Sequence, residues 1–143
     1  MEYDFEKLAK EIVLEKLKGA ADPPAVAAEI AHKIAVSARA GTIGKQPPRV
    51  TIAAACRGVM AGMLLIEKDL PKTAVALLAK MALVAHEAHL DPAECMTWAM
   101  EGIAPVVQLA PEGTAAAVGA AIEEHFMGTG EAFEAVLRSA GAS

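Results

Sequence analysis

The apolar run from Val50 to Ile66 constrains the fold more than any other feature of the sequence, because its only charged residue is Arg57. A helix without a polar face belongs in the middle of a packed structure. We therefore predict a central apolar helix over residues 49–68. Arg57 also leaves the run without 18 consecutive uncharged residues, so we expect no membrane span.

Helix start and stop signals divide the rest of the chain. Pro23, Pro71, Pro92 and Pro111 stand where a first-turn proline would open a helix, and Gly41 follows the end of one. No stretch alternates apolar and polar residues with the period of a strand. The other predicted helices cover residues 4–18, 23–40, 71–89, 111–127 and 130–140, and a further one opens at Pro92.

Length and composition agree with a helical fold. The chain of 143 residues is long enough to bury one core without disulfides or metal. Its apolar fraction is 55%, and it contains 33 alanines, the residue with the highest helix propensity. We predict an all-α, single-domain bundle of about six to seven helices that spans residues 1–143.

Small residues recur every four positions along the central helix, at Ala54, Gly58 and Gly62. Glycine inside a helix costs about 1 kcal/mol relative to alanine, and close packing against another helix can offset that cost. We expect the tightest helix crossing along this side of the central helix.

Arg57 requires a partner if its helix is buried, since an isolated buried charge is too costly. Glu101, Glu123 and Glu124 are the carboxylates that we expect to meet it. Two alternatives remain open: the side chain reaches solvent, or it faces a cavity and binds an anionic ligand.

Charge and terminal sequence limit the function classes. The net charge of −5 excludes a broad basic surface for nucleic acids. The acidic start, Met1–Glu6, is unlike a secretory signal, so we expect a cytoplasmic protein. Cys56 and Cys95 have no metal-ligand spacing and are predicted to be buried thiols.

The histidines do not form a recognised metal motif. His86 and His89 are three residues apart, whereas a zinc-protease helix needs a spacing of four. Glu29 and His32 match half of a di-iron pattern, but no second pair exists, and Glu29 lies four residues before Lys33, a spacing typical of a solvated ion pair. We predict no metal, no cofactor and no catalytic residue.

Trp98 is the best candidate for an interface residue. It borders the polar face of its predicted helix beside Met96, Met100 and Glu101, and tryptophan is enriched in binding hot spots. Charge is also uneven, since residues 34–72 carry six basic and two acidic side chains while residues 73–143 carry two basic and nine acidic. Complementary surfaces of this kind steer association.

These observations favour a small helical protein that acts by protein–protein association, as a homodimer or with another protein. The alternative is a ligand-binding protein or enzyme with an interior pocket lined by Arg57 and either His86 or His125. The sequence contains no nucleophile motif that identifies an enzyme.

Overall fold

The computed structural model describes residues 4–41 and 46–141, and this part of the chain folds entirely into α-helices and their connections, with no strand. The all-α prediction is therefore confirmed. The described helices are α1 (Phe5–Lys16), α2 (Pro23–Arg39), α3 (Pro48–Leu65), α4 (Leu70–Ala88), α5 (Pro92–Leu109), α6 (Thr114–His125) and α7 (Thr129–Gly141).

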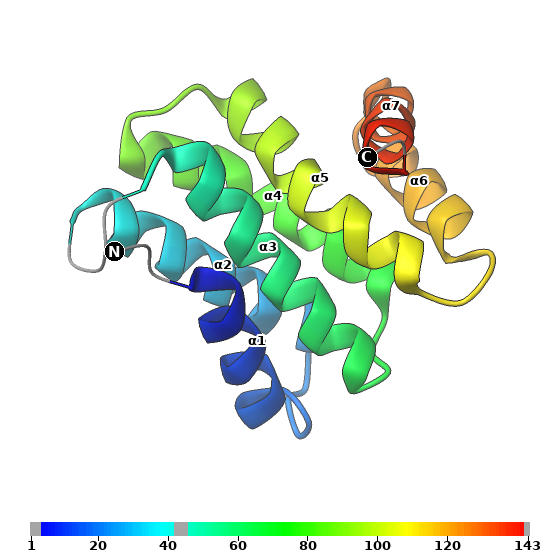
Figure 1. Ribbon diagram of the computed structural model, residues 1–143, viewed down its shortest axis with the longest axis horizontal. Coiled ribbons are helices and arrows are strands. Elements are labelled where there is room, and N and C mark those ends of the chain that lie inside the picture. Colours follow the sequence, from blue (N-terminus) through cyan, green and yellow to red (C-terminus); the bar gives the residue numbers. More distant parts are fainter. Residues whose placement is uncertain (1–3, 42–45, 142–143) are drawn as a thin grey trace.

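The helices form a bundle with α3 near its middle. α1 and α5 lie on either side of α3, while α2 and α4 pack behind them (Figure 1). α6 contacts α4, α5 and α7, and α7, which is seen nearly end-on in Figure 1, contacts only α5 and α6. All seven helices contribute side chains to one hydrophobic core.

Aspartates cap the first turns of four of the helices. The side chains of Asp4, Asp22, Asp69 and Asp91 each accept a hydrogen bond from the backbone N–H three residues later, at 2.9 to 3.4 Å. This is the usual way in which an N-cap side chain satisfies a free N–H group of the first turn. The caps therefore fix where α1, α2, α4 and α5 begin.

Two predicted helix boundaries are wrong for local backbone reasons. α3 ends at Leu65 rather than at residue 68, because Glu67 adopts a left-handed conformation (φ 54°) and the Lys68 N–H bonds to the Met63 carbonyl. That arrangement closes a helix end. α6 begins at Thr114 rather than at Pro111, since the Thr114 N–H bonds to the Pro111 carbonyl in a turn.

The central helix is less enclosed than the sequence suggests. α3 contacts α1, α2, α4 and α5, but Val50 is 45% exposed, Leu65 is 59% exposed, and half of the helix is buried. α3 is also the one described helix that is long and apolar enough to cross a membrane. A helix in the core of a soluble bundle can have the same length and composition.

The glycines of α3 lie where α1 crosses it. A Cβ on Gly58 would collide with the carbonyl oxygen of Glu6, and a Cβ on Gly62 would lie 2.7 Å from Cγ1 of Val13. Ala54, one turn earlier, is half-buried and packs against the core. The absence of side chains at Gly58 and Gly62 therefore allows the two backbones to approach closely.

A third glycine, which the sequence analysis did not single out, makes the matching contact on the other side of α3. A Cβ on Gly102 of α5 would collide with the backbone carbonyl of Ala53. α3 is therefore held between α1 and α5 by close contacts that depend on glycine.

Gly58→Ala should destabilise the protein by about 1–3 kcal/mol, because the added methyl group meets backbone that cannot move away without separating α1 from α3. Gly119→Ala is the matched control, since a Cβ at this position within α6 would have Phe133 as its nearest neighbour, at 4.0 Å. That variant should gain up to about 1 kcal/mol from helix propensity. Denaturant unfolding midpoints measure both effects, and equal shifts in the two variants would contradict the close crossing.

Candidate functional site

The candidate site is an open groove between α3, α5 and α7 with a volume of about 630 Å³. We call it the Arg57 groove. α3 contributes Arg57, α5 contributes one wall, and α7 contributes small and apolar side chains. Its lining residues are Arg57, Glu101, Pro105, Ala135, Val136, Ser139 and Ala140.

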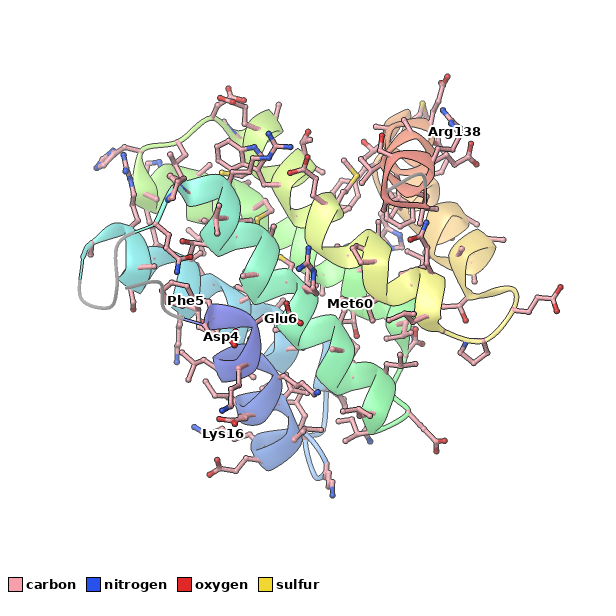
Figure 2. All side chains as sticks on the ribbon, viewed as in Figure 1. Asp4, Phe5, Glu6, Lys16, Met60 and Arg138 are labelled. Carbon is pink, nitrogen blue, oxygen red and sulfur yellow. The ribbon has the colours of Figure 1, made fainter. Side chains whose placement is uncertain are left out.

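Arg57 has few partners for a guanidinium with five donors. Its Nη1 lies 3.4 Å from Oε1 of Glu6, which extends from α1 towards α3 (Figure 2). Both side chains are about two-fifths exposed, so this ion pair is weak. The Nε atom is shielded from solvent and has no hydrogen-bond partner among the described residues. Arg57 therefore has N–H donors that no described residue accepts from.

The predicted partners of Arg57 are wrong, because Glu6 of α1 pairs with it and the three predicted carboxylates bind elsewhere or face solvent. Glu101 binds Arg49 instead, through two hydrogen bonds of 2.9 and 2.6 Å. Glu123 accepts hydrogen bonds from the backbone N–H groups at the start of α7, and Glu124 is exposed. All three predicted carboxylates therefore stabilise other contacts or face solvent.

Pro105 gives one wall of the groove an unusual backbone. It lies within α5 and has no N–H to donate to the Glu101 carbonyl one turn earlier. This carbonyl therefore lacks its usual helical partner on a helix segment whose side chains line the groove. The wall of the groove on α5 presents the apolar ring of Pro105.

The predicted interface residues separate into surface and core. Trp98 and Met96 are half-buried, whereas Met100 is 3% exposed and belongs to the core. Trp98 and Glu101 share a face of α5 because they are three residues apart. Trp98 is thus available at the surface beside the Arg49–Glu101 ion pair.

The structure does not bring His86 or His125 to Arg57. Both histidines are exposed and neither lines the groove. His125 Nδ1 lies 2.9 Å from the Ala121 carbonyl of its own helix. The expected interior pocket is therefore replaced by an open groove without histidine.

His32 is an ionisable residue whose burial and partners the sequence did not predict. It is buried between α2 and α4, with Nε2 3.1 Å from Glu87 and Nδ1 3.5 Å from Glu29. Glu29 pairs with Lys80 at 2.8 Å and not with Lys33, because α4 covers this face of α2. The spacing between Glu29 and Lys33 could not indicate that Lys80, which is distant in sequence, is the partner of Glu29.

Metal and thiol chemistry find no support in the described part of the chain. It contains no group of three or more His, Cys, Asp or Glu residues that could hold a metal ion. Cys56 and Cys95 are free and buried. Burial raises the pKa of the Cys56 thiol to about 12 and also raises that of Cys95, so neither thiol is activated as a nucleophile.

Comparison with known proteins gives no functional assignment: no family model, curated protein or solved structure matches the chain.

Lys80→Met should lower stability at neutral pH by at most about 1 kcal/mol, because the Lys80–Glu29 pair is partly exposed. The hydrogen bond from Lys80 is the main cause that lowers the pKa of Glu29 below its ordinary 4.5. The contribution of the pair is therefore present above pH 4.5 and is lost as the pH falls further and Glu29 is protonated.

Urea midpoints at neutral pH and well below the ordinary pKa of Glu29 measure this difference, with Lys33→Met as the control. Lys33 is exposed, and its removal should change stability little at either pH. The assignment of Lys80 as the partner of Glu29 is contradicted if Lys33→Met lowers stability as much as Lys80→Met at neutral pH.

Proposed function

We propose that the protein acts by association with other protein molecules, first of all with a second copy of itself, and that Trp98 anchors the contact. The supporting observation is the position of Trp98, which is the only tryptophan of the chain and lies half-buried at the surface of α5. A partly exposed tryptophan loses little entropy when a partner covers it and buries a large apolar area.

The surroundings of Trp98 suit an interface with a polar rim. The bidentate Arg49–Glu101 ion pair lies next to it along α5 and joins the start of α3 to that helix. Val50, the sequence neighbour of Arg49, is 45% exposed. An aromatic anchor, an exposed aliphatic side chain and a charged pair together have the composition typical of a protein interface.

Uneven charge along the chain favours one relative orientation of the two copies. Residues 34–72 carry a net positive charge, with six basic and two acidic side chains, whereas residues 73–143 carry a net negative charge, with two basic and nine acidic. Two copies can therefore present surfaces of opposite sign to each other. This part of the proposal predicts an assembly that salt weakens, because exposed charges are screened over about 8 Å at 0.15 M ionic strength.

Trp98→Ala should weaken self-association by about tenfold or more while leaving helix content unchanged, because truncating a hot-spot tryptophan typically costs this much affinity. Sedimentation equilibrium at micromolar concentrations measures the association constant, and circular dichroism measures helix content. Leu109→Ala is the matched control, since Leu109 is an 82% exposed apolar residue at the far end of α5.

A wild-type protein that sediments as a monomer throughout this range would contradict self-association. A dimer that Trp98→Ala and Leu109→Ala affect equally would contradict the role of Trp98. Indifference to added salt would reject only the electrostatic contribution.

A further inference from the structure

The Arg57 groove contains a cation whose hydrogen-bonding capacity is largely unused. Among the described residues, Arg57 has one hydrogen bond, the 3.4 Å contact with Glu6. Arg49, two turns earlier on α3, holds both oxygens of Glu101 at 2.9 and 2.6 Å. Arg49 thus makes a short bidentate pair with a carboxylate, whereas Arg57 makes a single long contact and has more unused donors.

The rest of the groove is mainly apolar and lined by short side chains. Pro105, Ala135, Val136 and Ala140 provide its apolar surface, and Arg57 is its only basic residue. The volume of about 630 Å³ lies within the range that small ligands occupy in proteins. The groove thus combines one cationic side chain with apolar surface.

The neighbouring carboxylates limit the charge of a ligand. Glu101 lines the groove, although its charge is balanced by Arg49, and Glu6 already lies beside Arg57. A dianion such as a phosphate monoester would meet two negative groups, and Arg57 is the only basic residue in the groove lining. A single carboxylate matches Arg57 in charge and in its planar, two-oxygen geometry.

We propose that the Arg57 groove binds an amphipathic monocarboxylate, with its carboxylate on Arg57 and its alkyl chain along Pro105 and Val136. The ligand replaces Glu6 at the guanidinium, since the existing pair is long and half-exposed. This inference does not depend on association through Trp98, because the groove lining does not include Trp98.

Isothermal titration calorimetry with decanoate tests the proposal, with decanol and decyltrimethylammonium as probes of the same chain length. All three probes are used below the concentrations at which they form micelles. The wild-type protein should bind decanoate and should bind the cation at least about tenfold more weakly, because only the anion pairs with Arg57. No binding of decanoate, or equal binding of all three probes, would overturn the proposal.

Two substitutions should change decanoate affinity in opposite directions. Arg57→Gln should lower it about tenfold or more, while Glu6→Gln should raise it, because it removes the competing carboxylate from the guanidinium. A purely structural role for the Arg57–Glu6 pair does not predict tighter binding in Glu6→Gln. Wild-type affinity in a folded Arg57→Gln protein, or weaker binding in a folded Glu6→Gln protein, would overturn the assignment.

Arg138→Gln is the matched control for Arg57→Gln. Arg138 lies on α7, which forms a wall of the groove, but its side chain points outward from the bundle (Figure 2). The control removes the same charge and should leave decanoate affinity unchanged. A loss equal to that of Arg57→Gln would show that net charge and not the groove attracts the ligand.

Trp98→Ala separates this inference from the proposed association. The variant should bind decanoate with wild-type affinity even where it fails to self-associate. Decanoate binding by a wild-type protein that is always monomeric would support the groove proposal and contradict self-association. A wild-type dimer that does not bind decanoate would support self-association and contradict the groove proposal.

Discussion

The close contact of α3 with α1 on one side and α5 on the other is the constraint on which the rest of the structure depends. Each contact requires a position without a side chain: Gly58 and Gly62 face α1, and Gly102 faces the backbone of Ala53. Glycine inside a helix is unfavourable by about 1 kcal/mol. The packing that surrounds these positions offsets this cost and fixes how far apart the three helices lie.

The same crossing determines the electrostatic state of the groove. Gly58 brings the backbone of Glu6 against α3, and the Glu6 carboxylate then reaches the adjacent Arg57. On the other side, α5 places Glu101 beside Arg49, which satisfies that acid and keeps it from Arg57. Arg57 is consequently left with one long contact at the edge of an apolar groove.

The sequence predicted most of the helices and the close crossing at Gly58 and Gly62, but it did not predict which charged side chains tertiary packing brings together. First-turn prolines predicted where several helices begin, but Pro111 begins a turn instead, in which the Thr114 N–H bonds to the Pro111 carbonyl. The partner of Arg57 was not predictable, since Glu6 is 51 residues away and carries no distinguishing pattern. His32 was misjudged for a similar reason: Glu87, which meets its ring, is 55 residues away on α4.

Amide hydrogen exchange tests most directly whether the close contacts with α1 and α5 make α3 the most stable part of the fold. Amides in the middle of α3, from residue 58 to residue 62, should exchange only through global unfolding, since helices pack on both sides of them. Amides of α7, which contacts only α5 and α6, should exchange faster through local opening. Exchange in the middle of α3 that is as fast as in α7 would contradict this account.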